Sequence, residues 1–143
     1  MSFPMYKFRS MVVNAESQGA QFASKGDKRM THIGKFIRKY RIDELPQLYN
    51  VLRGDMSLIG PRPEQTDLLE GLIEKVPLFP LRHSVRPGIT GWAQVCQGYA
   101  YDIDSSSKKT SYDLFYIKNL SFLLDMTIII RTIRILLTGF GSR

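Results

Sequence analysis

Two adjacent carboxylates, Asp43 and Glu44, open the segment Asp-Glu-Leu-Pro-Gln at residues 43–47. Asp43 has the chemistry of an N-cap, and apolar residues follow it at helical spacing, so a helix is predicted to begin here. Pro46 suits the first turn, where backbone donors have no intrahelical partner. Asp43 and Glu44 would then lie at the positive end of the helix dipole, which favours a phosphate or a metal–phosphate complex.

Each carboxylate suits a different part of phosphate chemistry. Asp43, ionised at neutral pH, can attack phosphorus as a nucleophile without a general base. Glu44 can hold a divalent ion, and Mg²⁺ prefers such oxygen ligands. The plainer alternative is that Asp43 only caps the helix and Glu44 only complements its dipole. The neighbouring motifs decide between these interpretations.

Two arginines precede prolines in rigid segments. Arg62 stands between two prolines, which favour extended geometry there. Arg86 precedes Pro87-Gly88, which predicts a type II turn with Gly88 at positive φ. A stiffly held guanidinium loses little entropy when it binds a phosphate bidentately. Ordinary turns with surface arginines are the alternative, but beside the carboxylate pair they indicate one anion site. We expect both guanidiniums and both carboxylates to converge around a space the size of a diphosphate.

These segments together resemble the bacterial sugar transferase family, the monotopic polyprenyl-phosphate phosphoglycosyl transferases. The resemblance covers nearly the whole chain, in the order and spacing of the family. Besides the carboxylate and arginine motifs it is carried by Tyr-Lys-Phe-Arg-Ser-Met at 6–11, Asn-Val-Leu-Arg-Gly-Asp-Met-Ser at 50–57, Arg-Pro-Gly-Ile-Thr-Gly-Trp-Ala-Gln at 86–94 and Asp-Leu-Phe-Tyr-Ile-Lys at 113–118.

The resemblance implies that Asp43 is the covalent nucleophile and that Glu44 takes part at a Mg²⁺ site. It also implies that Arg62 and Arg86 bind phosphate or the nucleotide-sugar, and it makes Lys7 a candidate for substrate binding. The implied enzyme transfers a phosphosugar from a nucleoside-diphosphate sugar, with a UDP-sugar favoured, to polyprenyl (undecaprenyl) phosphate. An aspartyl intermediate is expected, and the product would begin a surface polysaccharide or glycoconjugate.

Family members carry an N-terminal apolar re-entrant membrane segment and a basic stretch ahead of the residues that match 6–11. The chain begins Met-Ser-Phe-Pro-Met and shows neither, so we expect residues 1–143 to be a catalytic domain truncated at its N-terminus relative to the family. The resemblance places the intact protein at the cytoplasmic face of the bacterial inner membrane, as a peripheral or monotopic protein on the anionic membrane surface. No nucleic-acid partner is expected.

The composition agrees with an anionic partner. The 143 residues suit one domain, and their formal net charge is +7. A single cysteine, Cys96, excludes an internal disulfide and a cysteine-based zinc cluster. The alternatives are a non-catalytic basic domain that binds anionic membrane or nucleic acid, and an inactive truncation. The basic domain gives no reason for the carboxylate pair, and it would require binding that depends steeply on salt and ignores uridine nucleotides.

Helical spacing of apolar residues predicts helices after Thr31, after Asp43, and at 65–76, 112–120 and 122–138. A short strand or hairpin is expected within 85–95, and residues 3–13 fit a strand or a turn of helix. Residues 14–28 fit a loop or a short exposed helix. Residues 99–110, with a serine- and lysine-rich run at their centre, are predicted to be a mobile loop that closes over substrate.

The last predicted helix, at 122–138, is apolar almost all round but contains Asp125, Arg131 and Arg134. These charges argue against a membrane-spanning helix. The segment is either a buried core helix or an interfacial helix whose apolar side faces lipid or a membrane segment, and we favour the second for part of its surface. The sequence therefore predicts a mainly helical single α+β domain with a small β component and an apolar C-terminal helix.

Overall fold

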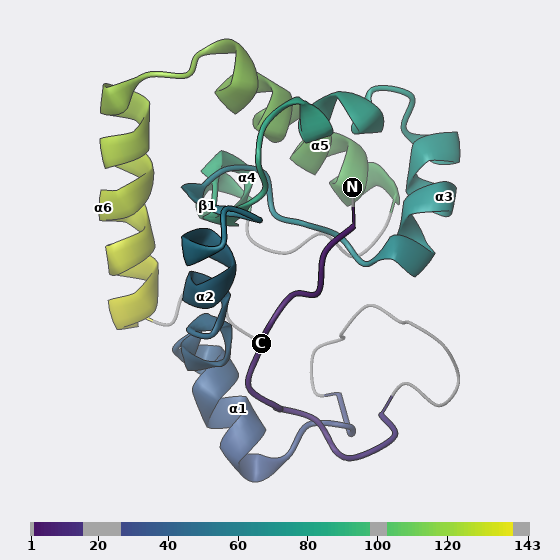
Figure 1. Cartoon of the computed structure of the whole chain (residues 1–143), viewed down its shortest axis with the longest axis vertical. Coiled ribbons are helices and arrows are strands. Elements are labelled where there is room, and N and C mark those ends of the chain that lie inside the picture. Colours follow the sequence, from purple (N-terminus) through teal and green to yellow (C-terminus); the bar gives the residue numbers. More distant parts are fainter. Residues whose placement is uncertain (1, 16–26, 98–102, 139–143) are drawn as a thin grey trace.

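The computed structural model describes residues 2–15, 27–97 and 103–138. Helices dominate it, with one small two-stranded sheet among the described residues (Figure 1). The predicted mainly helical α+β class is therefore confirmed. In chain order the elements are α1 (His32–Lys39), the 3-10 helix η1 (Ile42–Glu44), α2 (Gln47–Leu52), β1 (Ser57–Ile59), α3 (Thr66–Lys75), the 3-10 helix η2 (Phe79–Ser84), β2 (Gly88–Thr90), α4 (Trp92–Cys96), α5 (Ile103–Lys118) and α6 (Phe122–Thr138). Most of the loop predicted at 14–28 lies outside the described residues.

The sheet pairs β1 with β2 in parallel, with Ser57 opposite Gly88. The strand predicted within 85–95 is present, but it is not part of a hairpin. The type II turn predicted there is also wrong, because Gly54 is the glycine with positive φ among those described. Gly88 is needed for a different reason: a Cβ on it would lie 2.1 Å from the backbone nitrogen of Gly60. The two strands approach too closely there for any side chain.

A small apolar core lies where α3 meets η2. Leu72, Val76 and Phe79 form it, and Leu68 and Leu69 pack against it. The helix predicted at 65–76 is confirmed, because these leucines recur at helical spacing along α3.

The serine- and lysine-rich run at 105–109 is helical and belongs to α5. The predicted mobile loop is therefore wrong for residues 103–110, while 98–102 lie outside the described residues. The Thr110 hydroxyl donates to the Ser106 carbonyl at 2.9 Å, a bond that helical threonines make with the residue four positions earlier. Lys109 pairs with Glu64. The side chains of Lys109 and Thr110 are thus bonded to other groups of the protein.

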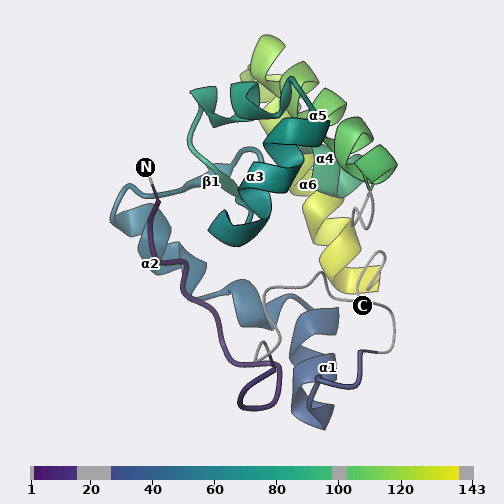
Figure 2. The ribbon, with the colours of Figure 1, turned by 90° about the vertical axis from the view of Figure 1, so that its right-hand side faces the viewer.

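α1 begins where the sequence predicts, because the Thr31 hydroxyl accepts a hydrogen bond from the Gly34 amide at 2.9 Å. Residues 3–13 form neither the strand nor the helical turn that we considered, apart from one antiparallel bridge between Met11 and Met30. They run as an irregular segment past α2 to α1 (Figures 1 and 2). Gly34 allows this packing, since a Cβ on it would lie 1.8 Å from the Ser10 carbonyl oxygen. Ile33 and Phe36 on α1 remain exposed.

α2 exposes leucines and buries polar residues, which is the reverse of an ordinary amphipathic helix. Leu48 and Leu52 are exposed, Leu52 by 86%, while Gln47 and Asn50 are buried. A soluble helix normally turns its leucines toward the core. Here the polar face packs inward because Asn50 binds the N-terminal segment, as described below.

α6 confirms the helix predicted at 122–138 and stands along one side of the molecule (Figure 1). Ile128 is fully buried, whereas Phe122, Leu123, Ile130 and Leu137 are exposed. The helix therefore contributes to the core with one face and leaves other apolar side chains uncovered. No helix within the described residues combines the length and the apolar character needed to cross a membrane.

Candidate active site

The carboxylate pair lies one turn before α2. Asp43 and Glu44 belong to η1, whereas α2 begins at Gln47, with Pro46 at its N-cap position and no side-chain cap. The predicted capping role of Asp43 is therefore wrong. The physical reason is that a 3-10 turn, closed by its own backbone hydrogen bonds, separates the carboxylates from the helix. Asp43 is consequently not occupied as a cap.

Arg62 holds the Glu44 carboxylate with both ends of its guanidinium. Nη2 lies 2.5 Å from Oε1 and Nη1 lies 3.1 Å from Oε2, and Arg41 Nη1 is 3.9 Å from Oε2. Burial by itself would raise the pKa of Glu44, but the charge and hydrogen bonds of Arg62 outweigh burial, and the pKa is lowered. Glu44 is therefore a fixed negative charge at neutral pH.

Asp43 has different surroundings from its neighbour. Asp43 is only 7% exposed to solvent. Burial, and then the negative charge of Glu44, raise its pKa, while Lys7, Arg38 and Arg62 act against this rise. Within the described part of the chain, its carboxylate makes no hydrogen bond or ion pair. An enclosed carboxylate among cations, with no bond to any of them, can bond to an atom that enters the site.

Lys7 is brought to the carboxylates by the N-terminal segment. The Phe8 amide donates to the Asp43 carbonyl at 3.0 Å. Asn50, which is fully buried, accepts from the Tyr6 amide at 3.1 Å and donates to the Pro4 carbonyl at 2.8 Å. These three bonds fix residues 4–8 against η1 and α2. Asn50 was missed as a site residue, because a buried asparagine on a leucine-rich helix has no local signal.

The ammonium of Lys7 titrates abnormally. Burial, and then the positive charge of Arg62, lower the pKa of Lys7 to about 8, while Glu44 and Asp43 act in the opposite direction. Much of the Lys7 surface is nonetheless open to solvent, and water at the group moderates such shifts. Lys7 therefore carries its charge at neutral pH and loses it in mildly alkaline solution.

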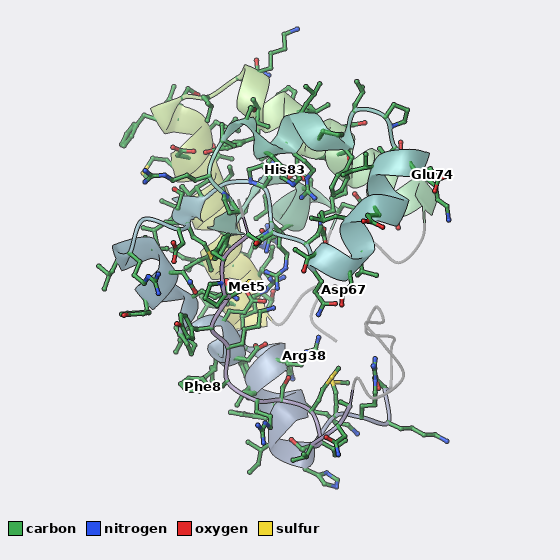
Figure 3. All side chains as sticks on the ribbon, turned by 45° about the vertical axis from the view of Figure 1, so that its right-hand side comes forward. Met5, Phe8, Arg38, Asp67, Glu74 and His83 are labelled. Atoms are coloured by element: carbon green, nitrogen blue, oxygen red, sulfur yellow. The ribbon has the colours of Figure 1, made fainter. Side chains whose placement is uncertain are left out.

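Arg38 of α1 is a further cation near Asp43, and the sequence predicted no role for it in the site. Its charge acts on both Asp43 and Lys7. Figure 3 shows Arg38 beside the part of the N-terminal segment between Met5 and Phe8. The helical pattern predicts that α1 has a basic face but does not say toward which element that face turns.

A buried ionic network supports Arg62 from behind. Arg82 is 2% exposed; its Nε and Nη2 lie 2.9 and 2.7 Å from Asp113 Oδ2. Nη2 also donates to the Arg62 carbonyl at 2.9 Å. Nη1 is 3.5 Å from Glu64 Oε1, which also pairs with Lys109. The network ties the segment that carries Arg62 to η2 and α5. Sequence reasoning assigned no role to these residues, because their pairing depends on contacts between distant segments.

Arg86 is not brought to the carboxylates. Its Nη1 lies 3.9 Å from the place that a Cβ on Gly54 would take, beyond the end of α2 that is farther from Asp43. The side chain lines a separate open hollow with Ser57 and Tyr116. The structure therefore gathers Lys7, Asp43, Glu44 and Arg62 but leaves Arg86 apart. A substrate-binding role for Arg86 stays a prediction that this position does not support.

The site's fit to Mg²⁺ follows from its donor set. No group of three or more histidine, cysteine, aspartate or glutamate side chains that could hold a metal occurs in residues 2–15, 27–97 and 103–138. Mg²⁺ does not need such a group, since it is commonly bound by one or two carboxylates, waters and substrate phosphates. The carboxylate of Asp43 meets this minimal requirement, and Glu44 retains lone pairs beyond its two bonds to Arg62. The pair therefore fits a Mg²⁺ ion that arrives with a phosphate.

The assembled groups suit transfer of a phosphoryl group. Asp43 offers a nucleophile without a competing partner, Glu44 anchors a rigid arginine, and Lys7, Arg38 and Arg62 supply positive charge around them. Fixed cations aimed at a place where negative charge develops are the main source of electrostatic catalysis. Neutral substrates would gain nothing from this arrangement.

Comparison with known proteins agrees with this chemistry. The family described as bacterial sugar transferase matches residues 1–139. The chain is 58% identical over 141 residues to UDP-N-acetylgalactosamine-undecaprenyl-phosphate N-acetylgalactosaminephosphotransferase of Aeromonas hydrophila, covering 99% of this chain and 33% of that protein. It is 45% identical to the uncharacterized sugar transferase EpsL of Bacillus subtilis, covering 97% of this chain and 65% of EpsL. It is 38% identical to undecaprenyl-phosphate galactose phosphotransferase of Salmonella typhimurium, covering 98% of this chain and 31% of that protein.

The chain thus spans about a third of two of these relatives and about two thirds of the third. The matched part of each relative aligns with the residues that form the carboxylate site.

Proposed function

This chain belongs to the bacterial sugar transferase family, and we propose that it carries the catalytic centre of a phosphoglycosyl transferase. The donor is a nucleoside-diphosphate sugar with uridine as its nucleoside, as the name of one relative suggests by analogy. The acceptor is a polyprenyl phosphate, as the names of two relatives suggest. The observation that carries the proposal is Asp43, a buried carboxylate without a bonded partner, beside Glu44 and enclosed by Lys7, Arg38 and Arg62.

The proposed first step is attack of an Asp43 carboxylate oxygen on the β-phosphorus of the donor. A new oxygen–phosphorus bond forms, the bond between the β-phosphorus and the bridging oxygen breaks, and nucleoside monophosphate leaves with the electron pair. In the second step a phosphate oxygen of the acceptor attacks the same phosphorus. The bond to Asp43 breaks, which regenerates the carboxylate and releases the sugar-diphosphate lipid. An acyl phosphate is reactive enough to pass the group on.

The cations have distinct parts in this scheme. Arg62, whose guanidinium is held by Glu44 and whose carbonyl is held by Arg82, supplies a fixed positive charge to the diphosphate. Lys7 and Arg38 offset charge on the transferring group. Mg²⁺ held by Glu44 would neutralise donor phosphate oxygens.

The sugar is left open by this site. The relatives carry N-acetylgalactosamine in one name and galactose in another, although the chain resembles both along almost its full length. We therefore assign the phosphoryl chemistry to the described centre. We also propose that the protein works at the cytoplasmic face of the inner membrane, where a polyprenyl phosphate is available, and that its product begins a surface polysaccharide or glycoconjugate.

The covalent step can be tested in the full-length protein by omitting the acceptor. Wild type incubated with UDP-sugar and Mg²⁺ should release at most one nucleoside monophosphate per site, and the peptide that contains Asp43 should gain the mass of a phosphosugar. Asp43→Asn should form no adduct and show no turnover, while donor binding persists. Stability should change little, because Asp43 makes no side-chain hydrogen bond to lose.

Asp67→Asn is the matched control, since Asp67 is an exposed carboxylate on α3 (Figure 3). It should retain wild-type adduct formation. Turnover by Asp43→Asn, or the absence of an adduct under conditions in which wild type is active, would contradict the covalent route and favour direct transfer between donor and acceptor.

A further inference from the structure

A cavity separate from the hollow beside Arg86 adjoins the carboxylate site. Its volume is about 130 Å³, and it lies between the start of α2, the β2–α4 segment and the C-terminal half of α6. We call it the slot. Its apolar wall consists of Leu45, Leu48, Ile89, Val95, Ile135 and Leu136.

Most polar groups in the wall of the slot hydrogen-bond to other groups of the protein. The Thr90 hydroxyl donates to Thr132 Oγ1 at 2.7 Å, and Thr132 donates to the Ile128 carbonyl at 2.8 Å. Gln94 Nε2 donates to the Ile89 carbonyl at 3.1 Å. Gln94 Oε1 is the buried acceptor of this wall that has no partner among the described residues. A sugar needs many donors and acceptors, so the wall does not suit a sugar.

The lining of the slot is charged in one part and apolar in the rest. Glu44 and Arg41 belong to the lining, so the slot adjoins the carboxylate that Arg62 holds. Leu45 and Leu48 also line it and are exposed, and Leu52 extends the same side of α2. A ligand that enters from this apolar surface can therefore reach the charged centre without leaving an apolar wall.

These observations point to a hydrocarbon attached to a phosphate. We propose that the slot binds the isoprene unit next to the phosphate of the acceptor lipid, which is an inference that rests on the proposed function. The size agrees, because an engineered apolar cavity of about 150 Å³ holds benzene, and an isoprene unit has one carbon fewer than benzene. The slot thus sets the depth at which the acceptor phosphate meets the phosphosugar on Asp43.

The test narrows the slot without touching the charged site. Val95→Phe in the full-length protein enlarges a wall residue, and Leu136→Trp does the same from α6 if the first variant folds poorly. Acceptors would be phosphates of one and two isoprene units and the long polyprenyl phosphate. The KM of Val95→Phe for each should rise about tenfold, as expected when burial of about two methylene groups is lost. Nucleoside monophosphate release from donor alone should match wild type.

Val13→Phe is the matched control, because Val13 is exposed and lies outside the slot. It should leave the KM for the donor and the KM for the acceptor unchanged. An unchanged acceptor KM in both slot variants would overturn the proposal, and lowered thermal stability with normal kinetics would show that another part of the polypeptide fills the slot. A raised donor KM, especially one reproduced by Gln94→Leu, would instead make the slot a nucleoside pocket and would equally overturn it.

The same experiment separates this inference from the proposed function. If wild type forms no adduct but transfers phosphosugar, the covalent route fails while the acceptor KM still measures the slot. If wild type transfers no phosphosugar at all, the proposed function fails, and equilibrium binding of the two-unit prenyl phosphate to wild type and Val95→Phe still decides whether the slot binds an isoprene.

Discussion

At the scale of single residues, two neighbouring carboxylates acquire different chemistry from their surroundings. Glu44 is bound by Arg62, which keeps its pKa low, whereas burial and the charge of Glu44 raise the pKa of Asp43. Because a nucleophile must be ionised, adduct formation should fall as the pH falls through the raised pKa of Asp43. This loss is expected at a higher pH than the titration of an ordinary aspartate.

The pKa of Lys7 gives a prediction for the alkaline side. This pKa is lowered to about 8, so Lys7 becomes neutral above that pH and no longer attracts a diphosphate. In wild type, kcat/KM for the donor should therefore decline above about pH 8, because this ratio reports the free enzyme. Lys7→Arg should remove the decline, since arginine stays protonated. Lys7→Met should weaken donor binding roughly tenfold at neutral pH, as the loss of one close charge contact implies.

Lys35→Met serves as the control, because Lys35 is exposed on α1 and should leave the profile unchanged. A decline above pH 8 that persists in Lys7→Arg would assign the titration to another group.

At the scale of elements, the site depends on segments that the sequence does not mark as functional. α3 and α6 were predictable because their apolar residues recur locally, and α1 because Thr31 provides a cap. The start of α5 was not predictable, because its serines and lysines resemble a loop until Glu64 is seen to bind Lys109. The carboxylate pair and Arg62 were found from their motifs, whereas Asn50 and Arg82 act through contacts across long sequence separations. The role of Arg38 depends on the direction in which α1 turns its side chains.

The buried network around Arg82 should matter far more for stability than a surface pair. Arg82→Leu leaves the Asp113 carboxylate without its buried partner and leaves Glu64 with Lys109 alone, which should lower the free energy of unfolding by about 3–5 kcal/mol. Arg53→Leu breaks the pair with Asp55, 3.4 Å apart and on the surface, and should cost less than about 1 kcal/mol. Denaturant unfolding of both variants measures the contrast.

Arg82→Lys adds a test of function, because it keeps the charge but loses the fork that also binds the Arg62 carbonyl. We expect the rise in activation free energy that lowers kcat to exceed the loss in the free energy of unfolding. Equal losses for Arg82→Leu and Arg53→Leu would show that the network contributes no more than an exposed ion pair.

At the scale of the whole molecule, apolar side chains stay uncovered on α1, α2 and α6. Phe36, Leu52 and Leu137 are examples, and the chain carries a net charge of +7. Apolar exposure beside positive charge is typical of proteins that associate with anionic membranes. The sequence predicted an uncovered apolar side for the helix at 122–138. It did not predict that the leucines of α2 would face outward, because leucines at helical spacing normally face the core.

Vesicle binding tests this surface. The protein should sediment with anionic phospholipid vesicles, less so as salt rises and only weakly with neutral vesicles. Replacing Phe36 and Leu52 with glutamine should reduce binding several-fold, whereas Leu78→Gln, an exposed leucine before η2, should not. If no binding occurs at low salt, this surface is covered by protein and not by lipid.

The hydrogen bonds of Asn50 impose an order on biosynthesis. Asn50 bonds to Pro4 and Tyr6, which lie 46 and 44 positions before it in the chain. Arg82 bonds to Asp113, which lies 31 positions after it. On the ribosome residues 4–6 therefore emerge well before Asn50, which holds them, and Arg62 is braced only after α5 has been made. Long-range contacts of this kind form late in folding. A nascent chain thus cannot trap a donor in a half-built centre, because the centre matures only after α5 has been made.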